Sequence, residues 1–336
     1  MKFGYVPLDD AVGSISAHAV RAGEIVLRKG SRVTPEIAEK LKAAGVEGLV
    51  AARLDPEDVH EDEAAATLAR KLAGEGLRID PPFTGRANLF AERSGVLRLD
   101  RARIDAVNAA DEAITFATLP AFRPVSVGEM VATVKIIPYA VPRNALEKAM
   151  AQISAPLISI APYARRRIAA ISTLLPGLKP SVVAKTIEIL SQRLKPADGI
   201  VVFEERVPHE TEPLAGALRR ALAASPDIVI VFGASAISDR RDVIPAAVEA
   251  AGGRIEHLGM PVDPGNLLLI AELGNSPVLG APGCARSPKE NGFDWVLQRL
   301  LAGLPVGRAE VVAMGVGGLL MEIKSRPQPR AEPPKT

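Results

Sequence analysis

The stretch that decides the fold of the C-terminal half is DIVIVFGASAISDRRD, residues 227–242. After Asp227, five residues form an apolar, mostly β-branched run, which predicts a buried strand over Asp227 to Phe232. The next ten residues are small or polar and lead into a helix predicted over Asp242 to Ala251. A strand, a glycine-containing loop and a helix in this order are typical of βαβ units, where ligands bind at the carboxyl ends of the strands.

The same alternation continues on both sides of this stretch. Amphipathic helices are predicted over 183–194, 214–222 and 292–301. Short apolar runs predict the strands Ile168–Ser172, Gly199–Phe203, Arg254–Leu258, Leu267–Leu273 and Pro277–Leu279. Strands alternating with helices predict a three-layer α/β/α domain with a mostly parallel sheet, which we place at residues 165–306.

The flanking regions have a different pattern. Residues 1–164 mix short strands with helices expected near 35–44, 62–72, 101–110 and 142–153, which predicts an α+β region. After residue 306 we expect terminal strands over Ala309–Met314 and Leu319–Ile323, joined by a turn at Gly315–Gly318. The polar, proline-rich residues 324–336 are expected to be disordered.

Composition excludes several classes of function. Lys and Arg number 41 against 39 Asp and Glu, so no basic field exists to hold nucleic acid. No export signal is recognisable, and no apolar run approaches the roughly 20 residues that cross a bilayer, so no membrane role is expected. The single cysteine, Cys284, fits a reducing compartment, which predicts the cytoplasm. The four histidines show no metal-ligand spacing, so no resident metal site is predicted.

The loop at 233–242 is the first candidate ligand site. Small residues let backbone N–H groups approach a ligand, and the following helix N-terminus favours an anion such as phosphate. Arg240 and Arg241 either pair with that phosphate or are solvated surface arginines. Asp239 and Asp242 either cap the helix or have a catalytic role with metal or substrate. The predicted ligand-binding residues of this loop are Gly233, Ala234, Ser235 and Ser238.

The second candidate loop follows the strand at 277–279, in the stretch PVLGAPGCARSP over residues 277–288. Its glycines suit a turn that passes close to a ligand, although a turn without function would show the same glycines. Ser287-Pro288 forms a plausible helix start. Cys284 is either a ligand contact or a small buried hydrophobe. The predicted binding residues here are Gly280, Pro282, Gly283, Cys284 and Ser287, and both loops should lie at the same sheet edge.

Common nucleotide motifs are missing from these loops. There is no Gly-x-Gly-x-x-Gly at the first strand and no phosphate loop ending in Gly-Lys-Ser or Gly-Lys-Thr. A Rossmann dehydrogenase or a kinase is therefore disfavoured.

The two loops, in this order, resemble the molybdopterin-binding domain shared by molybdopterin adenylyltransferases and molybdopterin molybdenumtransferases. Residues 232–242 resemble the family's Ser-Gly-Gly-x-Ser-x-Gly-Asp-x-Asp, and residues 282–285 resemble its Pro-Gly-Asn-Pro turn. Residues 260–266 resemble its Met-x-Pro-Gly-x-Pro hinge. The chain is also similar to bacterial proteins in which this arrangement precedes a cytidylyltransferase-like domain.

The resemblance implies a pyranopterin ligand, molybdopterin or the molybdenum cofactor, and a role in cofactor biosynthesis or in maturation of molybdenum enzymes. It also implies Mg²⁺ where a nucleotide is bound, and a homo-oligomer. The family's Thr-Gly-Asp-Glu is Thr173-Leu174-Leu175-Pro176-Gly177 here, so two carboxylates are gone. Three functions stay open: a nucleotidyltransferase or molybdenumtransferase, a non-catalytic carrier serving a separate cytidylyltransferase or molybdenum hydroxylase, and a pyridine nucleotide-processing hydrolase of related fold.

Overall fold

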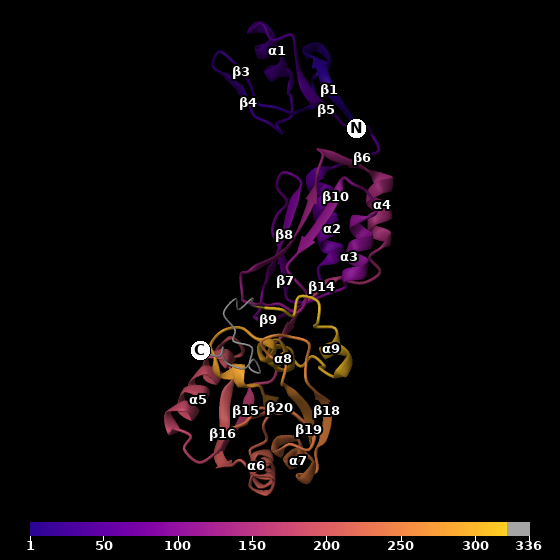
Figure 1. The fold of residues 1–336 in the computed structure, drawn as a ribbon. Coiled ribbons are helices and arrows are strands. Elements are labelled where there is room, and N and C mark those ends of the chain that lie inside the picture. The colour runs from indigo at the N-terminus through magenta and orange to yellow at the C-terminus, as the bar shows by residue number, and fades with distance from the viewer. Residues whose placement is uncertain (321–336) are drawn as a thin grey trace, which may run out of the picture. The chain divides into compact units, whose positions relative to one another are not determined.

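The computed structural model describes residues 1–320 of the 336-residue chain, which divides into two compact units. The N-terminal unit covers Met1–Pro162, and the C-terminal unit begins at Tyr163 (Figure 1). Each unit has its own buried apolar residues.

The N-terminal unit is α+β and contains two hydrophobic cores. The smaller core lies among β1, β5, α1 and their neighbours, and in the larger core α2 packs against β8 and β12. The helices are α1 (Pro35–Ala43), α2 (Glu61–Leu72), α3 (Arg101–Asn108) and α4 (Arg143–Ala151). The strands are β1 (Lys2–Pro7), β2 (Ile15–Ser16), β3 (Val20–Ala22), β4 (Ile25–Leu27), β5 (Gly48–Arg53), β6 (Asp58–His60), β7 (Leu77–Ile79), β8 (Arg86–Ala91), β9 (Gly95–Leu99), β10 (Ile114–Thr118), β11 (Pro124–Val125), β12 (Met130–Ile136), β13 (Ala140–Pro142) and β14 (Ile158–Pro162).

The C-terminal unit is built around a six-stranded sheet in the order β16-β15-β17-β20-β19-β18. The β15–β16, β15–β17 and β17–β20 pairs are parallel, and β19 runs antiparallel to both of its neighbours. The strands are β15 (Arg167–Leu174), β16 (Ile200–Pro208), β17 (Ile228–Phe232), β18 (Arg254–Leu258), β19 (Leu269–Leu273) and β20 (Ser276–Ala281). The helices are α5 (Pro180–Leu194), α6 (Thr211–Ala223), α7 (Val243–Ala250), α8 (Gly292–Leu301) and α9 (Arg308–Val312).

Successive residues of a strand point to opposite faces of the sheet, and in β17 both sets contact helices. Val229 and Val231 of β17 belong to a core that includes apolar residues of α6 and α7. Phe232 has the opposite orientation, and its ring centroid lies 6.4 Å from that of Phe293 on α8. A strand buried on both faces needs an apolar residue at every position, which explains the unbroken run Ile228–Phe232.

The predicted α/β class with a mostly parallel sheet is confirmed, and two local expectations are wrong. The strand expected over Ala309–Met314 is helix α9, whose first turn is capped by Glu310, which accepts a hydrogen bond from Gly307 N (2.8 Å). Ser287-Pro288 does not start a helix, because α8 begins at Gly292 after the N-cap Asn291. The turn expected at Gly315–Gly318 is present. Residues 321–336, including most of the last expected strand and the tail, lie outside the described residues.

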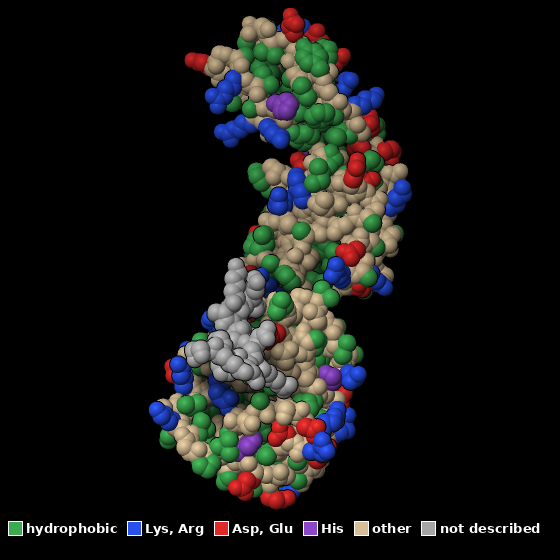
Figure 2. Space-filling model, in the orientation of Figure 1, with side chains coloured by type: hydrophobic (Ala, Val, Ile, Leu, Met, Phe, Trp, Pro, Cys, Tyr) green, Lys and Arg blue, Asp and Glu red, His purple; other side chains and the backbone are tan. Residues whose placement is uncertain are grey.

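The described surface carries mixed charge. On the face drawn in Figure 2, basic and acidic side chains are interspersed, in keeping with the near-equal numbers of the two. Within residues 1–320, no helix combines the length and apolarity that crossing a bilayer requires.

Candidate functional site

Strand register brings the two predicted loops together. Within the parallel pair β17–β20, Phe232 lies opposite Ala281, so the loops that start at Gly233 and Pro282 leave the sheet side by side. In the neighbouring pair, Ser172 of β15 lies opposite Phe232, which brings the end of β15 to the same edge. The expectation that both loops share one sheet edge is confirmed. We call residues 233–242 the first loop and residues 282–291 the second loop.

Thr173 ties the end of β15 to the first loop. Its side chain is buried, and its hydroxyl accepts a hydrogen bond from Ala234 N (2.8 Å). The same hydroxyl lies 2.8 Å from Nδ1 of His209, directly after β16. One side chain thus joins three neighbouring strand ends. The sequence interpretation missed Thr173, although the match to the threonine of the family's Thr-Gly-Asp-Glu was a signal that could have identified it.

Arg286 joins the second loop to the first. Its Nη2 donates to the carbonyl oxygen of Gly233 at 2.6 Å. The side chain is partly buried, and desolvation lowers its pKa. This residue was quoted in the sequence motif but was not among the predicted ligand contacts.

The glycines at this edge are required for different physical reasons. A Cβ on Gly233 would lie 2.6 Å from Ile244 Cδ1, and a Cβ on Gly280 would lie 2.6 Å from Ile237 Cδ1. Both are buried, so close packing explains them. Gly283, in contrast, is exposed, and a Cβ there would meet open space. It is therefore the glycine of the second loop that has room for a ligand beside it.

The predicted polar contacts of the first loop lie at its surface. Ser235 and Ser238 are exposed and Ala234 is partly buried. In the second loop Pro282 is buried, while Cys284 and Ser287 are partly buried. Burial raises the pKa of the Cys284 thiol, which keeps it protonated at neutral pH.

Asp239 and Asp242, the predicted catalytic residues, are both occupied by contacts within the first loop. Asp242 is the N-cap of α7, and its two oxygens accept from Val243 N (2.8 Å) and Ser238 N (3.2 Å). Both oxygens of Asp239 accept from the side chain of Arg241, at 2.7 and 3.3 Å. The hydrogen bonds from Arg241 lower the pKa of Asp239 to about 2. All four carboxylate oxygens therefore already have protein donors, and the pair offers no prepared magnesium site.

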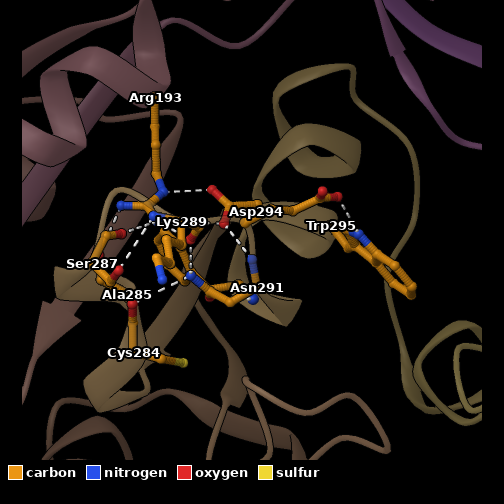
Figure 3. A network of polar contacts seen from close by, with 10 residues as sticks. Arg193, Cys284, Ala285, Ser287, Lys289, Asn291, Asp294 and Trp295 are labelled. Carbon is orange, nitrogen blue, oxygen red and sulfur yellow. Dashed lines mark hydrogen bonds and ion pairs between the residues drawn. The ribbon is translucent and has the colours of Figure 1, made fainter. Parts of the chain in front are cut away.

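The second loop is held by a buried arginine of α5 (Figure 3). Arg193 donates to the carbonyl oxygens of Ala285 (2.8 Å) and Ser287 (2.7 Å) and pairs with Asp294 of α8 at 2.5 Å. Side-chain exposure is 8% for Arg193 and 17% for Asp294, so water screens the pair weakly. Asn291, the N-cap of α8, also donates to the Cys284 carbonyl (3.3 Å). The backbone of the second loop is thus fixed by side chains from two helices.

A cavity of about 660 Å³ lies elsewhere in this unit, at the opposite end of β20. It is lined by the β19–β20 turn and by residues 300–307. Its charged lining consists of two arginines, Arg165 and Arg254, and three glutamates, Glu256, Glu272 and Glu310, and Arg254 pairs with Glu256 (2.5 Å) and Glu272 (2.9 Å). The acidic groups outnumber the basic ones, which does not suit a phosphorylated ligand, and the loop edge remains the better candidate. Across residues 1–320, no three or more His, Cys, Asp and Glu side chains form a group that could hold a metal ion.

Comparison with known proteins finds a family match within the C-terminal unit. Residues 169–303, which contain both loops, match the family described as "Probable molybdopterin binding domain". No curated protein matches the chain.

Several solved structures are also similar. A molybdopterin biosynthesis MoeA protein of Pyrococcus horikosii is 16% identical, with 90% of this chain and 75% of that chain covered and a TM-score of 0.31. A molybdenum cofactor biosynthesis protein of Pyrococcus furiosus is 14% identical, with 93% and 65% covered and a TM-score of 0.26. The CinA protein of Thermoplasma acidophilum, of unknown function, is 19% identical, with 38% and 91% covered and a TM-score of 0.26.

Proposed function

We propose that the C-terminal unit binds molybdopterin or the assembled molybdenum cofactor at the edge formed by the two loops, and that the protein acts in molybdenum cofactor biosynthesis or in maturation of molybdenum enzymes. One observation carries this proposal: in the domain that matches the molybdopterin-binding family, β17 and β20 end in register and Arg286 connects their loops. In open α/β sheets, ligands bind outside the carboxyl ends of the strands.

The edge offers the two kinds of contact that a phosphorylated pterin needs. Hydroxyls of Ser235 and Ser238 are exposed, and the Arg286 guanidinium supplies positive charge. Gly283 leaves open space where a flat ring system can approach the backbone. Because hydrogen bonds from Thr173 and Arg193 fix the backbone of the two loops, little conformational entropy needs to be lost on binding.

Within this proposal, a carrier that hands the cofactor to a separate cytidylyltransferase or to a molybdenum hydroxylase is favoured over a nucleotidyltransferase. Asp239 and Asp242 use all four oxygens within the loop, and the two carboxylates expected after β15 are Leu175 and Pro176. Magnesium with a nucleotide would need ligands that this loop conformation does not present.

Anaerobic isothermal titration of the full chain with molybdopterin tests the binding proposal. Gly283→Asp and Asn275→Asp each add one negative charge at opposite ends of β20, so they form a matched pair. We expect G283D to weaken binding at least tenfold and N275D to leave it within twofold. If the folded wild-type chain does not bind, or if both variants weaken binding equally, the proposed site is wrong.

A second assay separates the carrier from the enzyme. The chain is incubated with molybdopterin, Mg²⁺ and ATP or CTP, and released pyrophosphate is measured. The carrier hypothesis expects binding without pyrophosphate, whereas sustained release would establish a nucleotidyltransferase. The cytoplasmic location and the homo-oligomer stay predictions, the latter tested by light scattering.

A further inference from the structure

Arg286 is a charged side chain with no acidic partner in the part of the chain that the structure describes. Among residues 1–320 no carboxylate lies within ion-pair distance of it, and its hydrogen bond goes to the neutral Gly233 carbonyl. A guanidinium has five N–H donors, so this bond leaves most of them available. Burying a cation costs free energy unless an anion compensates it, and here the lowered pKa reflects desolvation alone.

Arg193 differs from Arg286 because the C-terminal unit supplies a counter-ion for it. Arg193 lies close to the same loop, yet it has Asp294 as a counter-ion and several carbonyl partners. Those partners include the carbonyls of Ala285 and Ser287, the two neighbours of Arg286 in the chain. Arg193 therefore fixes the backbone on both sides of Arg286, and the Gly233 carbonyl fixes the guanidinium itself.

The other candidate for anion binding, the N-terminus of α7, is already in use. Asp242 accepts from the amides of Ser238 and Val243, and Asp239 accepts from the amide of Arg241 (2.9 Å). A phosphate approaching this turn would have to displace carboxylates from the backbone amides that it needs. The expectation that the helix N-terminus binds the anion therefore loses its physical basis at this edge.

We propose that Arg286, rather than the N-terminus of α7, binds the phosphate group of the pterin, an inference that rests on the proposed function. A guanidinium fork matches the geometry of phosphate oxygens and can bind two of them at once. The bond to Gly233 holds one nitrogen of the guanidinium at the start of the first loop, while Arg286 itself belongs to the second loop. Arg286 is then the residue that selects the phosphorylated ligand over its dephosphorylated form.

Binding of molybdopterin and of dephosphorylated molybdopterin is compared by titration of the full chain in wild type, Arg286→Met and Arg220→Met. R220M is the control, because Arg220 is an exposed arginine in the last turn of α6 and lies outside both loops. We expect wild type and R220M to prefer the phosphorylated form by about 10- to 100-fold, the size of a charge-assisted hydrogen bond or pair. In R286M we expect this preference to fall below about threefold, while affinity for the dephosphorylated form is nearly unchanged.

The outcomes separate this inference from the proposed function. If wild type binds neither form, the proposed function fails and this inference fails with it. If wild type binds and R286M keeps the preference, or loses affinity equally for both forms, Arg286 is only a structural link and the inference alone is overturned. Should R286M not fold, NMR of the wild type tests the inference instead, with the Nε–Hε resonance of Arg286 assigned by comparison with R286K. This resonance should shift when the phosphorylated form is added and not when the dephosphorylated form is added. An equal shift with both forms, or no shift with either, overturns the inference.

Discussion

Replacing Arg193 with methionine should destabilise the C-terminal unit by about 3 kcal/mol. Removing one partner of a buried ion pair costs roughly 3–5 kcal/mol because the other charge stays buried. The lower end applies, since Asp294 is 17% exposed and keeps the hydrogen bond from Asn291 N (2.9 Å). For a domain of this size, roughly 2–4 °C of melting temperature are lost per kcal/mol, so the shift should be about 6–12 °C.

The assay is thermal and urea denaturation of the full chain, followed by tryptophan fluorescence. Trp295 is the chain's one tryptophan and lies on α8, next to Asp294, so the signal reports this unit and not the N-terminal one. The matched control is Arg220→Met, which removes the exposed ion pair with Glu205. Exposed pairs contribute little, so its shift should be less than a third of that of R193M.

A double-mutant cycle with Asp294→Asn tests the physical reason for the loss. Because R193M leaves a buried carboxylate unpaired, neutralising Asp294 in the same chain should restore part of the stability. Equal shifts for R193M and R220M, or full additivity of R193M with D294N, would refute the claim that this buried pair holds the second loop.

Three further predictions concern the same edge. Thr173→Val should lower the free energy of unfolding, measured in urea titrations, by about 1–3 kcal/mol because Ala234 N loses its acceptor. Its control, Ser172→Ala, should change that free energy by less than about 0.5 kcal/mol, since the buried Ser172 hydroxyl has no hydrogen-bond partner within the described residues. A larger loss for S172A than for T173V would contradict this prediction. Cys284 should react with iodoacetamide at pH 7 more slowly than a free thiol, because burial raises its pKa. Intact-mass spectrometry follows the reaction, and equal rates for Cys284 and a free thiol would contradict the prediction. Asp239 should titrate by NMR with a pKa of about 2, so its stabilising contribution is complete above the ordinary 3.8 and is lost as pH falls toward 2; a pKa near 3.8 would show that its arginine partner is absent in solution.

The sequence predicted the parts of this site that depend on local periodicity. The unbroken run over Ile228–Phe232 identified a strand buried on both faces, and its neighbours followed from the same reasoning. Placing both loops at one edge followed from the general rule for parallel strands. These features need no knowledge of which side chains meet in space.

Local patterns failed where capping or tertiary contacts decided the structure. The β-branched Val311 and Val312 favoured a strand, yet the bond between Gly307 N and Glu310 starts a helix there. Helix α8 begins after Asn291 and not at Ser287, because Asn291 and Asp294, three residues further on, form a capping box. The contact between Arg286 and Gly233 spans 53 residues, and no periodicity within either loop encodes it.

The same contact bears on whether this edge recognises a ligand or performs chemistry on it. A site for nucleotidyl transfer needs carboxylates that are free to bind metal, but Asp239 and Asp242 serve as internal acceptors. A site for recognition needs rigid loops and a charge of the right sign. Thr173 and Arg193 hold the two loops, and Arg286 has no carboxylate partner among residues 1–320. These contacts fit the proposal that this edge binds a ligand, and the use of Asp239 and Asp242 as internal acceptors is the reason that the carrier is proposed ahead of the nucleotidyltransferase.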